Sequence, residues 1–249
     1  MHPFLQAFPT RFPRLWRFAS ARFARGEYLG LHLTVGFAVV VATAWLFASL
    51  TEGVLDAEEI TRIDLAARVW LQARIDPAGI AGWDLVSTLG APGFVAAAWG
   101  AGALVLWRAR RWVVAAGWTA ALVGGGLLNL ALKDVVRRAR PADADLFLVG
   151  HSWSFPSGHA MGSLLCYGML AYLLLVYRHP SPWLRPVIVA GAVALVLLVG
   201  VSRVCLGVHY VSDVLAGWTA GALWLAACVS GLEISRRMPQ AGSQPEAPR

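Results

Sequence analysis

The sequence predicts an all-α membrane protein with six transmembrane helices in one bundle. Of its 249 residues, 58% are apolar and only 14% are charged, and the mean hydropathy is +0.60. Soluble domains carry about 25% charged residues, so this composition excludes both a soluble domain and a disordered chain. The apolar residues gather in six runs with charges at the run ends, where charge is least costly to a bilayer-spanning segment.

Each run is near the length that crosses a bilayer, because a hydrocarbon layer of about 30 Å takes about 20 helical residues. The first run continues through Trp45, Leu46 and Phe47, so we expect an uncleaved span and not a secretory signal peptide. The second run is short and is expected to take in flanking residues. The runs lie at about 31–50, 93–107, 112–132, 160–177, 186–202 and 212–232.

Three segments flank or interrupt the six-span domain, which we place at residues 31–238. Residues 1–30 are basic and form either an interfacial helix on anionic lipid or a loose flank that only sets topology. The long loop 52–92 contains an amphipathic stretch, 54–75, that we expect to lie as a helix over the outer membrane surface. The polar tail 239–249 is predicted to be disordered.

Arginine placement predicts the orientation. The first 26 residues contain five Arg and no acid, and the loops 108–111 and 178–185 and the C-terminal segment are also basic. With six spans these segments share one side, which the positive-inside rule makes cytoplasmic. We therefore expect a multi-pass protein of the cell (inner) membrane with both termini in the cytoplasm. The outer segments are then 52–92, 133–159 and 202–212.

Composition also excludes two kinds of site. The isoelectric point is near 10.0, but the basic residues are spread among apolar segments, which argues against a nucleic-acid-binding domain. The three cysteines, Cys166, Cys205 and Cys228, lie in or beside apolar runs. They offer neither a disulfide framework nor a zinc spacing, so we interpret them as small core residues.

The first chemical segment is a cluster of cations on the predicted outer side. It runs from Lys133, the only lysine of the chain, to Arg140 and Pro141. If the helix continues to the proline, Lys133, Arg137 and Arg140 share one face at i, i+4 and i+7. Such a face suits a phosphate, because an ammonium stands beside forked guanidinium donors. The alternative, a basic membrane flank, is disfavoured because the cluster is on the wrong side of the membrane for one.

The second segment, Ser154-Phe-Pro-Ser-Gly-His159, precedes the fourth span. Ser157 is expected to be the N-cap of that helix, and Gly158 lets an anion approach the backbone. The first N–H groups and the helix dipole form an anion site that His159, in the first turn, can reach. Taken alone, the pattern fits an ordinary capped span with an interfacial histidine equally well.

The third segment contains Ser202 and Arg203, followed by His209 and Asp213 at the entry to the sixth span. Residues four apart on a helix project from one face, so we expect His209 and Asp213 to interact. A carboxylate bonded to one imidazole nitrogen leaves the other as a nucleophile or base. A single pair of this kind is more often structural. Arg203 adds another donor for a phosphate.

Together the three segments resemble the signature of the type 2 phosphatidic acid phosphatases, the membrane-bound lipid phosphate phosphatases. That signature reads Lys-x6-Arg-Pro, Pro-Ser-Gly-His and Ser-Arg-x5-His-x3-Asp. The resemblance covers residues 133–213 by motif and the six-span layout by analogy, and it implies an active site at the extracytoplasmic interface. Its positions are filled by Lys133, Arg140, Pro141, Pro156, Ser157, Gly158, His159, Ser202, Arg203, His209 and Asp213.

The resemblance implies a role for each motif residue. His209 is the nucleophile that forms a phosphohistidine, and Asp213 orients it. His159 protonates the departing lipid oxygen and then activates water. No metal or other cofactor is expected, because cations bind the phosphate and the sequence has no carboxylate cluster to hold magnesium. The phosphate-binding residues are Lys133, Arg140, Ser157, Gly158 and Arg203.

The implied function is a metal-independent phosphatase acting on a lipid phosphate or pyrophosphate. Phosphatidate, phosphatidylglycerol phosphate and undecaprenyl pyrophosphate present the same terminal phosphate, so the sequence leaves the substrate open, together with the role of loop 52–92 and the oligomeric state. The expected partners are the lipid substrate and the bilayer. Neither a nucleic acid nor an obligate protein partner is expected.

Three alternatives remain. Vanadate-dependent haloperoxidases resemble the same motif set but are soluble, which this composition disfavours. A lipid phosphotransferase has the same site and differs only in the acceptor of the phosphoryl group. A non-catalytic transporter or binding protein for anionic lipids also needs a basic site, but no span carries the central charges that a midplane pathway usually shows.

Overall fold

The computed structural model describes residues 28–56, 59–141 and 152–237, within which all regular structure is helical. The chain divides into two compact units, residues 1–43 and 44–249. The described part of the first unit is the start of α3 (Tyr28–Asp56), where the Thr43 hydroxyl donates to the Val39 carbonyl at 2.7 Å. The tail 239–249, and the basic segment as far as residue 27, lie outside the described residues.

Helices follow one another through the second unit, and the connections are short except for the segment between α8 and α10. The three segments α7, η1 and α8 form one continuous helical rod, of which η1 is a π-helical turn. The helices after α3 are α4 (Glu59–Gln72), α5 (Pro77–Thr88), α6 (Pro92–Arg108), α7 (Trp112–Thr119), η1 (Ala120–Gly124), α8 (Gly125–Val136), α10 (Gly158–Tyr177), α11 (Leu184–Cys205) and α12 (Val211–Arg237).

Among the described residues, six helical stretches are long and apolar enough to cross a membrane. Each overlaps one of the six predicted runs. Many large apolar side chains on these stretches remain exposed, Leu104, Val105 and Val193 among them, as expected where lipid is the solvent. The stretches are Phe37–Asp56, Gly79–Arg108, Trp112–Val136, Gly158–Tyr177, Leu184–Cys205 and Val211–Arg236.

The second stretch confirms that the short run 93–107 takes in flanking residues, because it contains both α5 and α6. The two helices are separated by a break at residues 89–91, and Pro92 begins α6 at a position that needs no backbone N–H. Gly90 lies in this break. A Cβ there would come within 2.4 Å of Val199 Cγ1 and 3.1 Å of the His159 carbonyl oxygen. The break therefore lies directly against α11 and the first turn of α10.

The third stretch corrects one prediction. The helix does not continue to Pro141, because α8 ends at Val136 and Arg137 adopts a left-handed conformation with φ 50°. The Arg137 N–H closes the helix on the Lys133 carbonyl at 2.9 Å, and the Arg137 Nε donates to the Asp134 carbonyl at 2.8 Å. Lys133, Arg137 and Arg140 therefore do not share a helical face, and Arg137 is exposed whereas Lys133 is buried.

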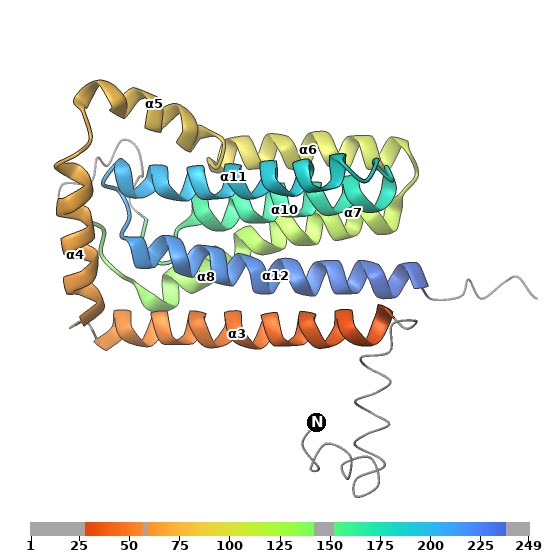
Figure 1. The fold of residues 1–249 in the computed structure, drawn as a ribbon, viewed down its shortest axis with the longest axis horizontal. Coiled ribbons are helices and arrows are strands. Elements are labelled where there is room, and N and C mark those ends of the chain that lie inside the picture. Colours follow the sequence, from red (N-terminus) through yellow and green to blue (C-terminus); the bar gives the residue numbers. More distant parts are fainter. Residues whose placement is uncertain (1–27, 57–58, 142–151, 238–249) are drawn as a thin grey trace, which may run out of the picture. The chain divides into compact units, whose positions relative to one another are not determined.

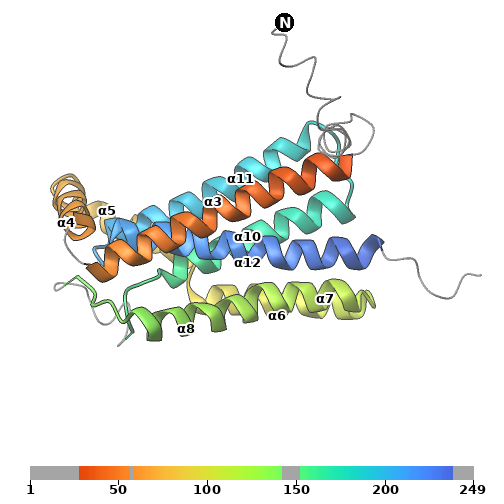
Figure 2. The ribbon, with the colours of Figure 1, turned by 90° about the horizontal axis from the view of Figure 1, so that it is seen from below.

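Helix α10 packs against α6, α8, α11 and α12, and it runs beside α12 in both views (Figures 1 and 2). Their contact is close at the start of α10, where a Cβ on Gly217 would lie 2.6 Å from the Ser157 carbonyl oxygen. This contact fixes the first turn of α12 beside the first turn of α10. The main apolar core includes Trp118, Leu122, Met161, Leu165, Met169 and Leu232.

The predicted amphipathic helix 54–75 is present in part. Helix α3 runs on to Asp56, and the amphipathic segment is the shorter α4. Figure 1 shows α4 crossing the ends of α11 and α12, with which it is in contact. Ile60 and Leu71 of α4 pack against buried residues of the interior, and Asp64 between them is also buried. Helix α4 therefore closes the end of the second unit at which the three motif segments lie.

Candidate active site

The motif side chains come from the ends of four helices. Lys133 is in the last turn of α8 and Arg203 in the last turn of α11, whereas Ser157 precedes α10 and Asp213 is in the first turn of α12. The structure brings these ends together around His159. Within electrostatic reach of His159 lie Lys133, Arg140, Arg203 and His209.

His209 and Asp213 form a buried pair. The His209 Nδ1 donates to Asp213 Oδ2 at 3.3 Å, because an ionised carboxylate can only accept. The same oxygen accepts from the Tyr210 N–H at 2.9 Å and from the Ser154 hydroxyl. This arrangement fixes the tautomer of His209, so that its Nε2 carries the lone pair, 3.2 Å from the Arg140 Nη1.

Burial controls the protonation of His209. Its side chain is 2% exposed, and this burial lowers the pKa of His209 to about 4, although the neighbouring Asp213 acts to raise it. The imidazole is therefore neutral at neutral pH, which is the form that a nucleophile requires.

Arg140 is held between two loops. Its Nε and Nη2 donate to the carbonyl and hydroxyl of Ser152 at 2.8 and 2.9 Å, and its Nη1 donates to the Val208 carbonyl at 2.8 Å. Burial lowers the pKa of Arg140 from its ordinary value, and Asp213 opposes this shift. These contacts hold the guanidinium beside His209 Nε2, where it can bind an anion that approaches this nitrogen.

Two further cations are buried. The Lys133 ammonium donates to the carbonyls of Trp153 and Ser154. The Arg203 Nη1 donates to the Ser87 hydroxyl, and its Nε is buried without a hydrogen-bond partner among the described residues. A buried donor left unpaired is costly. A phosphate oxygen is a suitable acceptor for it.

Ser157 is the N-cap of α10, as predicted, because its hydroxyl accepts from the Ala160 N–H at 3.5 Å. Its own N–H donates to the Asp213 carbonyl at 2.9 Å, which ties α10 to α12. Gly158 has little room for a side chain, since a Cβ would lie 3.0 Å from Asn129 Oδ1. The half-buried His159 follows in the first turn, beside the open N-terminus of the helix.

Sequence reasoning missed Arg138. Past Val136 the chain is no longer helical, and Arg138 and Arg140 are both partly buried and bonded to residues of the site. The Arg138 Nη1 donates to Asp213 Oδ1 at 2.7 Å. The i, i+2 spacing of the two arginines was the available signal, but it is informative only once the helix is known to end.

Three other polar residues were also missed: Asp64, Ser87 and Ser154. Asp64 had a readable signal, because it follows Ile60 by four residues and precedes Leu71 by seven, on the apolar face of α4. A carboxylate at such a position is either a mispredicted face or a buried partner of a cation. Ser87 and Ser154 are single serines whose neighbours in sequence give no such indication.

An apolar cavity of about 470 Å³ lies beside the site, between α6, α8 and α10. Asn129 and Gly158 form part of its wall, and Asn129 is one helical turn before Lys133. The cavity therefore borders the group of cations on one side. Its other lining residues include Gly90, Trp99, Gly126 and Met161.

Comparison with known proteins identifies relatives of this architecture. The chain is 45% identical over 102 residues to phosphatidylglycerophosphatase B of Bacillus subtilis (strain 168), covering 39% of this chain and 47% of that protein. It is 36% identical over 110 residues to the lipid A 1-phosphatase of Rhizobium johnstonii, covering 41% of each chain. The matches thus span less than half the length of both curated relatives.

Two crystal structures have a similar fold. The transmembrane PAP2-type phosphatidylglycerolphosphate phosphatase from Bacillus subtilis matches with a TM-score of 0.65 and 25% identity, covering 81% of this chain and 98% of that one. LpxE of Aquifex aeolicus matches with a TM-score of 0.53 and 20% identity, covering 68% and 95% of the two chains, and supports the fold alone. These likenesses confirm an all-helical, multi-pass membrane fold.

The family follows from a match to residues 112–237, which are just over half of the chain and include all three motif segments. This chain belongs to the PAP2 superfamily.

Proposed function

We propose that the chain is an integral membrane phosphatase that removes the terminal phosphate of a lipid phosphate or pyrophosphate through a phosphohistidine. One observation carries this proposal: the neutral, buried His209 has its Nδ1 held by Asp213, and its Nε2 faces a guanidinium. An oriented imidazole beside a cation suits nucleophilic attack on a bound phosphate.

In the proposed first step, the His209 Nε2 attacks phosphorus while the bond to the lipid oxygen breaks. His159 supplies the proton that this oxygen requires. In the second step, His159 takes a proton from water, the water oxygen bonds to phosphorus, and the bond to Nε2 breaks. Inorganic phosphate leaves and His209 returns to its neutral form. Asp213 stabilises the positive imidazole between the two steps.

Cationic side chains supply the charge that phosphoryl transfer requires. Lys133, Arg140 and Arg203 surround the reacting position, and the first N–H groups of α10 add a fourth source of positive potential. Positioning and charge stabilisation account for most catalysis of this reaction. The proposal therefore includes no metal, because ammonium, guanidinium and backbone N–H groups bind the phosphate oxygens in it.

The adjoining cavity supports a lipid as substrate. Its lining is almost entirely apolar, and Gly158 belongs both to its wall and to the phosphate-binding segment. A hydrocarbon chain in this cavity leaves its phosphate among the cations. We take phosphatidylglycerol phosphate as the first candidate, because one relative is named as a phosphatidylglycerophosphatase, followed by phosphatidate and undecaprenyl pyrophosphate.

We further propose that the protein resides in the inner membrane with its site on the outer face and both termini in the cytoplasm. The arginine-rich segments on one side and the acidic loop 52–92 on the other support this orientation.

The test is phosphate release by the purified protein in detergent, measured on the three lipids with EDTA present. We expect release of free phosphate that EDTA does not reduce, and a loss of roughly a thousandfold or more in His209→Asn. His179→Asn is the matched control, since His179 is exposed and has φ 45°, a conformation that asparagine accepts. It should keep wild-type activity.

Other outcomes contradict separate parts of the proposal. Inhibition by EDTA that magnesium reverses would remove the metal-free mechanism. Transfer of the phosphoryl group to a second lipid with no free phosphate would indicate a phosphotransferase. A His209→Asn variant as active as the wild type would favour the alternative of a non-catalytic transporter or binding protein for anionic lipids.

A further inference from the structure

Helix α4 contributes a carboxylate to the site from outside the motif segments. Asp64 is 1% exposed and accepts three hydrogen bonds from two residues. Its Oδ2 accepts from the Arg138 Nη2 at 2.7 Å and from the Ser212 hydroxyl, and its Oδ1 accepts from the Ser212 N–H at 3.0 Å. A carboxylate buried this deeply is retained only where cations and donors compensate it.

Arg138 joins this carboxylate to the catalytic one. While its Nη2 binds Asp64, its Nη1 binds both Asp213 Oδ1 and the Ser212 hydroxyl at 2.7 Å. The guanidinium also lies over the Tyr210 ring, with its carbon 4.3 Å from the ring centroid. Burial acts to lower the pKa of Arg138, but Asp213 and Asp64 outweigh it and raise the pKa. Arg138 is therefore a fixed cation between two carboxylates.

The two carboxylate oxygens of Asp213 bind different partners, and this difference connects Arg138 to His209. Oδ1 binds Arg138, and Oδ2 binds His209, Ser154 and the Tyr210 N–H. The bond on Oδ1 helps to set the plane of the carboxylate, and with it the position of Oδ2 beside the His209 Nδ1. Asp64 fixes the other end of Arg138 and so fixes that bond.

The net charge of the group around Arg138 also indicates a role for Asp64. The two carboxylates outnumber the single guanidinium, so the group of Asp64, Arg138 and Asp213 carries one excess negative charge. That excess negative charge stabilises the positive charge that develops on His209 as phosphorus is attacked. Without the Asp64 charge, Arg138 neutralises Asp213, and the developing imidazolium loses part of its stabilisation.

We infer that Asp64 is a positioning residue for the nucleophile, acting on His209 through Arg138 and Asp213. This inference rests on the proposed phosphatase function. It gives loop 52–92 a part in catalysis, because the loop supplies Asp64, which begins the series of hydrogen bonds through Arg138 and Asp213 to His209.

The test compares Asp64→Asn with Asp64→Glu on dihexanoyl phosphatidate, which is water-soluble. Asp64→Asn keeps the shape and removes the charge, and we expect its kcat to fall roughly tenfold to a hundredfold with KM within about twofold. Asp64→Glu keeps the charge and changes the shape, and we expect it to retain more activity. A packing role predicts the opposite order of the two variants. Glu59→Gln, on the exposed face of the same helix, is the control and should match the wild type.

A double-mutant cycle with Arg138→Met tests the path. If Asp64 acts through Arg138, the double variant Asp64→Asn with Arg138→Met is no slower than Arg138→Met alone, to within about twofold. Multiplied effects would overturn the inference. If Asp64→Asn is not recovered folded, Ser212→Ala removes one donor to the same carboxylate and is expected to lower kcat about fivefold. An unchanged kcat in that variant would also overturn it.

Failure of this inference is distinguishable from failure of the proposed function. A wild-type protein that releases no phosphate from any of the lipids overturns both. An active wild type with an equally active Asp64→Asn overturns only the inference.

Discussion

His209 is subject to two opposing influences, and their balance determines how the site works. Burial favours the neutral imidazole, whereas the bonded Asp213 favours the charged one, and burial prevails with a pKa of about 4. Nε2 therefore keeps its lone pair across the physiological range, as the proposed attack on phosphorus requires. In the proposed mechanism Asp213 becomes important later, when a phosphorylated imidazole carries the positive charge that burial penalises.

This balance predicts a dependence of stability on pH. The pKa of His209 is about 4 in the folded protein and near 6.5 in an unfolded chain, so between these values the unfolded state binds more protons. The stability that His209 contributes is therefore present above the unfolded pKa and is lost as the pH falls toward 4. We expect the unfolding midpoint of the wild type, relative to that of His209→Asn, to fall through this window and to be constant above it.

Thermal unfolding of both proteins in one detergent, over this range of pH, measures the difference directly. The titrating groups that do not interact with His209 contribute equally to the two proteins, so their contributions cancel. A midpoint difference that stays constant from neutral pH down to pH 4, or that grows in favour of the wild type, contradicts the neutral imidazole.

The spacing of residues in the sequence predicted some of the side-chain contacts of the site and not others. The four-residue spacing of His209 and Asp213 predicted their contact, because Asp213 lies in the first turn of a helix and His209 just before it. The predicted shared face of Lys133, Arg137 and Arg140 was wrong, because it assumed a helix where the backbone turns left-handed. A helix end shifts every later side chain to a new direction, and nothing in a run of arginines marks that end.

At the scale of helices, the apolar cavity beside the site depends on glycine. Gly90, Gly126, Gly158 and Gly162 all line it. A Cβ on Gly126 would meet nothing within 4 Å, so the space next to it belongs to the cavity. A side chain at this position would therefore enter the cavity.

We expect Gly126→Leu to discriminate between substrates by chain length. A leucine there fills part of the cavity and should lower kcat/KM for dioleoyl phosphatidate roughly tenfold, while dihexanoyl phosphatidate stays within about twofold. Gly191→Leu is the matched control. Gly191 is also on a span, also has nothing within 4 Å, and does not line the cavity. Equal losses on both lipids would place the hydrocarbon chain elsewhere.

The prediction of helices succeeded for the membrane spans, where the length of an apolar run alone is sufficient evidence. The six apolar runs each became a spanning stretch, because a bilayer imposes a minimum length on any helix that crosses it. Helix α4 and the break before α6 were only partly anticipated. Their limits depend on tertiary contacts, those of Asp64 with Arg138 and of Gly90 with Val199, which join segments far apart in the sequence.

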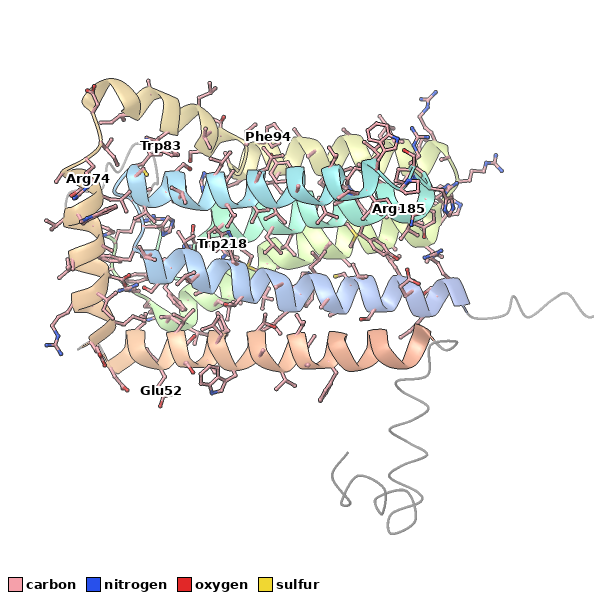
Figure 3. The ribbon with its side chains drawn as sticks, in the orientation of Figure 1. Glu52, Arg74, Trp83, Phe94, Arg185 and Trp218 are labelled. Atoms are coloured by element: carbon pink, nitrogen blue, oxygen red, sulfur yellow. The ribbon has the colours of Figure 1, made fainter. Side chains whose placement is uncertain are left out.

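At the scale of the whole protein, the site and its substrate must be on the same side of the membrane. The catalytic end of the second unit is the one that α4 covers, and the loops between α6 and α7 and between α10 and α11 are at the other end. Figure 3 shows Arg74, beyond α4, and Arg185, at the start of α11, at these opposite ends. The basic loops lie at the Arg185 end, so the orientation proposed above has that end in the cytoplasm.

Cysteine labelling in spheroplasts tests this orientation. We expect a membrane-impermeant maleimide to label Arg74→Cys in intact spheroplasts and Arg185→Cys only after permeabilisation, since both side chains are exposed on their respective ends. The unsubstituted chain measures the background from Cys228, which is partly buried, and from the buried Cys166 and Cys205. The reverse pattern would place His209 on the cytoplasmic face. The enzyme would then take its lipid from the inner leaflet, and the cation cluster at Lys133 would obey the positive-inside rule after all.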